Sequence, residues 1–199
     1  MPEATTQEVL KVTTPEFRAS YVFIWEPRKP QPGEENKKPC YSVQALFDKT
    51  ADLTAMKALA QNALKKKFPD YFPGKPGFRS PFRDGDTDPA YAGKEECAGK
   101  VVVAMRSYNR QPGVVDQQCN PIIEKEDLYS GCYLRATVTA YTYLHGGNKG
   151  VSFSLQNVQK VRDGVPLSAG AAKAENDFEK LAPNAADYQT NNTQLFGDI

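Results

Sequence analysis

The sequence has only one histidine, His145, which lies in the glycine-rich segment HGGNKG. Its four cysteines, at positions 40, 97, 119 and 132, are scattered and form no C-x-x-C pair. Because zinc sites draw their ligands mainly from these two residue types, we expect reduced thiols and no zinc site. The chain also has no G-x-x-x-x-G-K-[ST] segment and no nucleophile at a motif spacing from the histidine. We therefore expect no catalytic activity and no cofactor.

Long apolar runs and an excess of one charge are missing too. No segment approaches the roughly 20 apolar residues of a membrane span, and the amino terminus lacks the basic start and apolar core of a signal peptide. We expect a soluble, intracellular protein without a membrane partner. The net charge is +1, but residues 165–199 hold two lysines and five carboxylates, a net −3 that leaves +4 on residues 1–164. A mildly basic body precedes a weakly acidic end.

One acidic segment, DGDTD at residues 84–88, has the spacing of a calcium loop. Asp84, Asp86 and Asp88 match its first ligand positions, and Glu95 falls at the twelfth position. The sixth position, which needs glycine for its sharp turn, is Pro89. We therefore expect a solvated turn without a bound metal; the alternative is a metal-dependent nuclease built around Asp84, Asp86 and Glu95.

Hydrophobic periodicity predicts a mostly β chain of five strands with one main helix. Strands are expected at residues 17–26, 40–47 and 100–108, and a hairpin of residues 132–144 and 150–162 is expected around HGGNKG. Between the second and third strands, apolar residues recur at helical spacing from Leu53 to Leu64. Asp52 or Thr50 can cap this helix, and Pro69 ends it.

Two of the predicted strands have an apolar face opposite an aromatic and cationic face. Residues two apart in a strand share a face. In the first hairpin strand, this rule opposes the inward residues Cys132, Leu134, Ala136, Val138 and Ala140 to the outward residues Tyr133, Arg135, Thr137, Thr139, Tyr141 and Tyr143. In the strand near residue 104, it opposes Val101, Val103 and Met105 to Lys100, Arg106, Tyr108 and Arg110.

Outward tyrosine and arginine on two separate strands favour a ligand with flat faces and negative charge. Single-stranded nucleic acid fits, because its bases stack on aromatic rings at roughly 1–3 kcal/mol each and its phosphates pair with Arg and Lys. A duplex-binding protein needs a groove-entering helix, whereas the predicted helix has an Ala-rich surface without an arginine row. The alternative is that the tyrosines only decorate half-exposed strands, where they are common.

The long connection over residues 68–99 contains the segment FRSPFR, which pairs rings and charges four residues apart. Phe78, Arg79, Phe82 and Arg83 could clamp a nucleic-acid strand there, or the two phenylalanines could simply pin the loop to the barrel. On the first strand, Tyr21, Phe23 and Trp25 share one face, and Val22 and Ile24 share the other. The sequence does not decide which face is inside, and Tyr21 and Trp25 are further candidate contacts.

Three stretches carry a resemblance to a known family: EFRASYVFIWEP, NPIIEKEDLYSGCYLRATVTAYTY and KGVSFSLQNVQKVRDG. With the order of the predicted elements, they resemble the OB-fold single-stranded DNA-binding proteins of tailed bacteriophages, of the podovirus replication type and a related phage family. The resemblance implies a five-stranded OB barrel that binds single-stranded DNA with little sequence preference. It places this activity in phage DNA replication, recombination or repair, in the cytoplasm of the infected bacterial host.

The resemblance also implies a carboxyl-terminal tail that contacts phage replication proteins. We expect the OB-fold domain over residues 10–165, and a short helix with a flexible, weakly acidic tail over residues 166–199. Leu195, Phe196 and Asp198 are the expected partner-binding residues, although the long acidic run of the family is missing and Phe196 is not the last residue. The sequence leaves the oligomeric state open between monomer and dimer. The alternative function is a phage structural or assembly protein that uses a β-barrel to bind protein.

Overall fold

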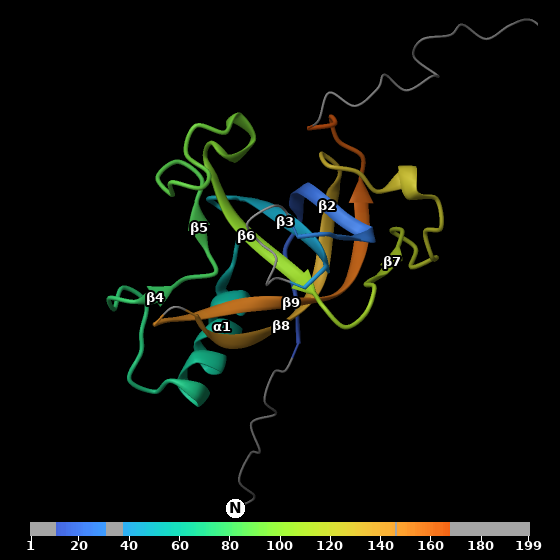
Figure 1. Cartoon of the computed structure of the whole chain (residues 1–199). Helices are drawn as coiled ribbons and strands as arrows, with labels where there is room; N and C mark the ends of the chain where they lie inside the picture. The colour runs from blue at the N-terminus through green and yellow to red at the C-terminus, as the bar shows by residue number, and fades with distance from the viewer. Residues whose placement is uncertain (1–10, 31–37, 146, 168–199) are drawn as a thin grey trace, which may run out of the picture. The chain divides into compact units, whose positions relative to one another are not determined.

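The computed structural model describes residues 11–30, 38–145 and 147–167, in which a single α-helix lies beside the strands (Figure 1). The expected tail residues Leu195, Phe196 and Asp198 lie outside this part of the chain. In chain order the elements are β1 (Val12–Thr13), β2 (Phe17–Arg28), β3 (Cys40–Asp48), α1 (Thr54–Lys67), β4 (Phe78–Arg79), β5 (Arg83–Asp84), η1 (Glu95–Cys97), β6 (Lys100–Ser107), β7 (Gly113–Val115), η2 (Lys125–Asp127), β8 (Tyr133–His145) and β9 (Asn148–Arg162).

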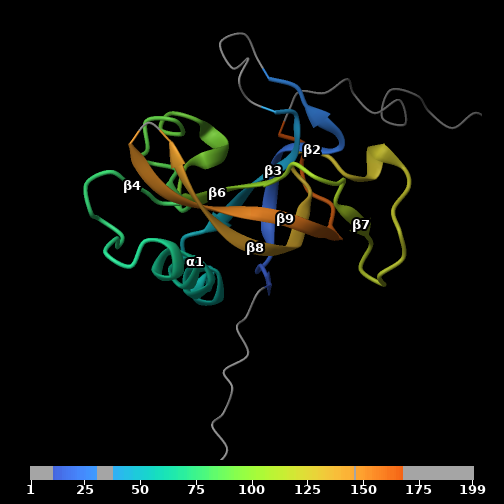
Figure 2. The same ribbon diagram turned by 60° about the horizontal axis from the view of Figure 1, so that its bottom comes forward.

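Five long strands close into a ring, which is the barrel visible in Figures 1 and 2. The order around the ring is β2, β3, β6, β9 and β8, and pairing of Phe17 with Leu134 returns from β8 to β2. The β6–β9 pair is parallel, and the other ring pairs are antiparallel. These are the five strands predicted from periodicity. The prediction missed β1, β4, β5 and β7, because strands of two or three residues are too short to show an alternation.

The barrel interior is filled by the alternating apolar residues of the ring strands. On β8, Leu134, Ala136 and Val138 are buried as predicted, and Phe17 meets Phe47 edge to face with ring centroids 5.4 Å apart. Residue pairing in the hairpin continues to His145 and Asn148, which leaves only residues 146 and 147 between the strands. The turn is therefore tighter than HGGNKG as a whole.

Helix α1 contacts β8, β9 and β1, and both views show it beside the β8–β9 hairpin (Figures 1 and 2). Neither of the two predicted caps is the N-cap, which is Leu53. Asp52, one residue earlier, still accepts a hydrogen bond of 2.9 Å from the N–H of Thr54, the first residue of the helix. The helix stops at Lys67, just before Pro69, as predicted. Its apolar side packs into the core through Met56, Leu59, Ala60 and Leu64. Among the described residues, no helix is long and apolar enough to cross a membrane.

The outer side of the barrel is not open everywhere. Leu46 on β3 and Val102 on β6 point outward by their position in the alternation, yet both are buried in a second small cluster with Cys97 and the partly buried Tyr91. The loop between β5 and β6 supplies this cover together with Leu167, which follows β9. The open part of the β3–β6 surface therefore begins at the next outward residues, Gln44 and Ala104.

A bulge in β2 determines which face of this strand points into the barrel. The pairing of β2 with β3 shifts between Ser20 and Phe23, and within this bulge Tyr21 has a φ of 48°. Ile24 is fully buried in the barrel, whereas Tyr21 is 49% exposed. The aliphatic face of this strand is thus the inner one.

Candidate nucleic-acid interface

Three strands bring a ring, a glycine and a guanidinium group into one row at the hairpin end of the barrel. Tyr143 on β8 pairs with Gly150 on β9, and Gly150 pairs with Arg79 on β4. Directly paired residues share a face of the sheet. A Cβ placed on Gly150 would lie 2.4 Å from Tyr143 Cζ, so the phenol ring covers the backbone at this glycine. Tyr143 is only partly buried, so part of this side chain stays exposed to solvent.

The next rows continue this surface with small residues on β9. Tyr141 pairs with Ser152, and Thr139 pairs with Ser154. Ser154 also pairs with Arg106 on β6, which in turn pairs with Ser42 on β3. Small side chains on β9 thus separate Tyr141 and Tyr143 on β8 from Arg106 on β6. We call this surface the tyrosine face; it comprises Arg79, Arg106, Tyr108, Tyr141, Tyr143, Gly150, Ser152 and Ser154.

Tyr108 joins the tyrosine face from the end of β6. Its side chain is half exposed, at 50%. Partial burial, and secondarily the neighbouring phenol of Tyr141, raise the pKa of Tyr108, which places the two phenols close together. The tyrosines on β6 and β8 therefore lie on one surface, as the alternation predicted.

Cations on the outer surface differ in whether a protein group already holds them. Among the described residues, Arg79 and Arg106 have no carboxylate within ion-pair distance, so their charges are available to an anion. By contrast, Arg83 binds Asp88 at 2.7 Å, and Lys100 binds Asp48. Arg110 donates to the carbonyl oxygen of Gln156 at 3.1 Å, and Arg135 donates to the side chain of Gln159 at 2.6 Å.

In the FRSPFR segment the two phenylalanines pack against the barrel, whereas Arg79 has no carboxylate partner among the described residues. The ring of Phe82 meets the buried Phe153 edge to face at 5.6 Å, and Phe78 also packs against the core. This geometry favours the interpretation in which the two phenylalanines pin the loop. Arg79 and Arg83 instead line an open cavity of about 440 Å³, together with Asp84, Asp88 and Asn148. Of these two arginines only Arg79 lacks a carboxylate partner in the described structure.

Two other candidates are held by protein contacts away from the hairpin end. Tyr133 lies at the far end of β8, where the Arg162 guanidinium carbon is 3.3 Å from its ring centroid and Arg162 pairs with Glu16 at 2.7 Å. Trp25 packs partly on the core, and its indole N–H donates to the carbonyl oxygen of Lys125 at 3.1 Å. The structure does not bring either ring onto the tyrosine face.

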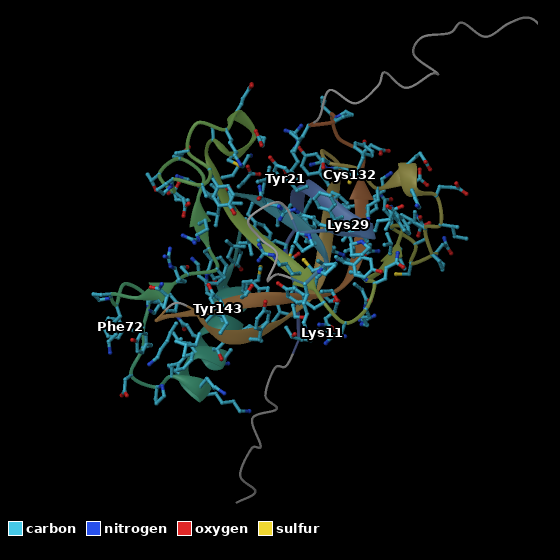
Figure 3. All side chains as sticks on the ribbon, in the orientation of Figure 1. Lys11, Tyr21, Lys29, Phe72, Cys132 and Tyr143 are labelled. Carbon is cyan, nitrogen blue, oxygen red and sulfur yellow. The ribbon has the colours of Figure 1, made fainter. Side chains whose placement is uncertain are left out.

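Tyr21 presents its ring from the opposite margin of the barrel surface. The ammonium group of Lys94 lies 5.6 Å from the centroid of Tyr21 and equally far from that of Tyr91, so the lysine bridges the β2 bulge and the β5–β6 loop. In the view of Figure 3, Tyr21 and Tyr143 lie on either side of β6. This order agrees with the ring, in which β2 and β8 are separated by β3, β6 and β9 on this side.

Comparison with known proteins identifies the family. The profile of the family described as Enterobacter phage Enc34, ssDNA-binding protein, matches residues 10–189. The chain belongs to this family. Over 101 residues it is also 38% identical to protein p50 of Acyrthosiphon pisum secondary endosymbiont phage 1, an alignment that covers 50% of this chain and 52% of p50. The chain thus matches about half the length of this curated relative.

Solved structures of phage proteins share the fold. The single-stranded DNA-binding protein from bacteriophage Enc34 in complex with ssDNA matches with a TM-score of 0.66 and 22% identity, over 80% of this chain and 90% of that chain. The single-stranded DNA-binding protein gp2.5 of bacteriophage T7 matches with a TM-score of 0.54 and 13% identity, over 86% of this chain and 96% of that chain. The predicted family and the predicted five-stranded OB barrel are therefore both confirmed.

Within this Enc34-family barrel, sequence reasoning missed several residues of the outer surface. Gln44 lies on β3 beside Ala104, and its amide nitrogen is buried without a hydrogen-bond partner. Lys94 and Tyr91 belong to a loop with no periodic pattern. Gly150 could have been found, because glycine inside a strand often marks a close approach of another group.

Two aspartates of the acidic DGDTD segment form ion pairs with one lysine, Lys49. Lys49 Nζ lies 3.1 Å from Asp84 and 2.7 Å from Asp86. Hydrogen bonds from the Asp86 N–H and from Lys49 lower the pKa of Asp84, and hydrogen bonds from Lys49 and from the Gly99 N–H lower the pKa of Asp86. Both carboxylates therefore stay ionised as partners of one ammonium group at the edge of the β5–β6 loop.

Proposed function

We propose that this chain binds single-stranded DNA without strong sequence preference and without catalysis. Bases stack on Tyr141 and Tyr143, and phosphates pair with Arg79 and Arg106. The chain protects and organises the exposed strand during phage DNA replication, recombination or repair in the cytoplasm of the infected host. The observation that carries the proposal is the ring of Tyr143 over Gly150, because a ring supported on one side by backbone offers its other side to a base.

The surroundings of the two tyrosines support a single strand over a duplex. OB folds bind oligonucleotides on the face of their second and third strands, which here are β3 and β6, with Arg106 on β6 and Tyr108 just after it. Arg106 pairs with Ser154 on β9, and β9 pairs with the β8 strand that carries both tyrosines. Stacking on Tyr141 and Tyr143 requires bases with uncovered faces, which a duplex does not offer. The small side chains of Ser152 and Ser154 do not form a pocket shaped for one particular base, which agrees with a low sequence preference.

The tail belongs to the same proposal as a contact for phage replication proteins. Leu195 and Phe196 form an apolar pair in a polar stretch, and Asp198 follows them. An apolar anchor beside a carboxylate is a feature that a partner with a basic-rimmed pocket can bind.

A titration of a fluorescent oligonucleotide tests the proposal directly. We expect the protein to bind a single strand more tightly than a duplex of equal length. The logarithm of affinity is expected to fall linearly with the logarithm of salt concentration, with a slope of about 0.7 for each phosphate neutralised. Equal affinity for both forms of DNA, or no binding at low salt, would contradict it.

A further inference from the structure

A second group of rings and ammonium groups lies on the other side of the β8–β9 hairpin. Lys149 Nζ is 4.1 Å from the ring centroid of Tyr71 and 5.0 Å from that of Phe68. Lys75 Nζ is 4.6 Å from the same Tyr71 ring and 5.9 Å from the Phe72 ring. We call this group, Phe68, Tyr71, Phe72, Lys75 and Lys149, the Tyr71 patch.

The Tyr71 patch is built rigidly and still leaves one ring uncovered. Three prolines, at positions 69, 73 and 76, restrict its backbone. The turns are closed by backbone hydrogen bonds from Tyr71 to Phe68 (3.0 Å) and from Lys75 to Phe72 (3.1 Å). Phe72 nevertheless exposes 59% of its surface. A large ring held in water by an ordered segment loses little entropy when it binds a flat partner, so it is suited to stacking.

The charge around the Tyr71 patch is mostly positive. Residues 65–75 contain four lysines and one carboxylate, Asp70. Three of these lysines, Lys65, Lys66 and Lys67, form the last turn of α1. Such a lysine-rich surface with an uncovered ring has the chemistry of a single-stranded nucleic acid site, where cations meet phosphates and rings meet bases.

The hairpin joins the Tyr71 patch to the tyrosine face. Tyr143 pairs with Gly150, and the next pair along the hairpin is Leu144 with Lys149. Neighbouring residues of a strand point to opposite faces, so Tyr143 and Lys149 lie on the two sides of the same two-stranded ribbon. Figure 3 labels Tyr143 and Phe72 at the end of the molecule where this hairpin turns.

We propose that the Tyr71 patch is a second contact site for single-stranded DNA, which receives the nucleotides that leave the tyrosine face around the end of the β8–β9 hairpin. The inference rests on the proposed function of the tyrosine face. It states that the DNA continues from the tyrosine face to the Tyr71 patch. It also predicts that the full DNA-binding site is longer than the barrel surface alone.

The length dependence of binding tests this inference. OB folds occupy about 4–16 nucleotides, so oligothymidines from about 6 to about 30 nucleotides are titrated with the wild type and with Phe72→Ala. We expect both proteins to bind the shortest oligomers equally. For the long oligomers, the variant is expected to bind at least about five-fold more weakly, which is the effect of removing one ring that stacks on a base.

Two further variants complete the test. Ile123→Ala removes another large exposed apolar side chain, on the loop before η2, and it is expected to match the wild type at every length. Lys65→Gln combined with Lys67→Gln is expected to reduce the salt slope for long oligomers by about 0.7 for each phosphate that is no longer neutralised, and to leave the slope for short oligomers unchanged.

The possible outcomes separate this inference from the proposed function. If the wild type binds no oligomer, the proposed function fails. If the wild type binds but Phe72→Ala and the lysine variant both match it at every length, the second site does not exist and the Tyr71 patch only braces the hairpin. Weaker binding of the shortest oligomers would assign Phe72 to the first site and would also overturn the inference.

Discussion

The ring of Tyr143 covers the α-carbon of Gly150 so closely that a Cβ at this position would lie 2.4 Å from Cζ, 2.5 Å from Oη and 2.7 Å from Cε1. Cζ is the nearest atom, and Oη and Cε1, two of the three atoms bonded to it, are slightly farther away, as expected when the face of the ring and not its edge lies over the glycine. The glycine therefore sets the height and tilt of a ring that we propose to stack on a base.

Gly150→Ala is expected to weaken binding of single-stranded DNA, because the new methyl group must push the Tyr143 ring away from its position over β9. Fluorescence titration of an oligothymidine measures the loss. The matched test is the double variant Gly150→Ala with Tyr143→Ala. Once the ring is gone, the methyl group has nothing to displace, so the double variant is expected to bind as Tyr143→Ala alone. Additive losses would show that Gly150 acts by another route.

Removing both rings, with Tyr141→Ala and Tyr143→Ala, is expected to weaken binding by roughly 1–3 kcal/mol for each stacked base. The thermal midpoint is expected to stay nearly unchanged, because both side chains lie outside the barrel core. Titration and thermal unfolding of the same preparation measure the two effects. Tyr141→Phe with Tyr143→Phe keeps the rings and is expected to retain most of the affinity. If the alanine variant binds like the wild type, the tyrosines only decorate the sheet.

Arg106→Gln is expected to reduce the slope of log affinity against log salt by about 0.7, because its guanidinium group is available to a phosphate. The same change at Arg162 is the control, since Arg162 stacks on Tyr133 and pairs with Glu16. Arg162→Gln is expected to leave the salt slope unchanged and to lower the unfolding midpoint instead. Titrations at several salt concentrations distinguish the two, and equal slopes for Arg106→Gln and the wild type would remove Arg106 from the site.

The five ring strands and α1 were predictable because each carries its pattern over eight or more residues, long enough for a period to show. The same alternation assigned Tyr141, Tyr143, Arg106 and Tyr108 to one outer surface. What alternation could not supply is the environment of each outward residue. Leu46 and Val102 point outward and are buried, because a loop with no pattern of its own folds over them.

Tyr133 and Tyr143 show the same limit. Both are outward tyrosines on β8 and look equivalent in the sequence. Their difference depends on their partners on β9, a guanidinium group from Arg162 for Tyr133 and the bare backbone of Gly150 for Tyr143. Such pairings follow from the register of β8 with β9, which a single sequence does not reveal.

Substitutions of Tyr21 can change the stability of the fold without changing the loss of DNA binding. The φ of Tyr21 is 48°, in the left-handed region, which costs a non-glycine residue roughly 1–2 kcal/mol. The half-exposed ring at such a position is consistent with a residue kept for its contacts with a ligand. Tyr21→Gly and Tyr21→Ala both remove the ring and are expected to weaken binding of single-stranded DNA equally. The glycine variant is expected to be more stable than the alanine variant by roughly 1 kcal/mol, since only glycine adopts this φ without strain. Urea unfolding compares their free energies, and titration compares their affinities. Equal stability of the two variants would mean that the bulge relaxes once the ring is gone, and wild-type affinity in both would exclude Tyr21 from the site.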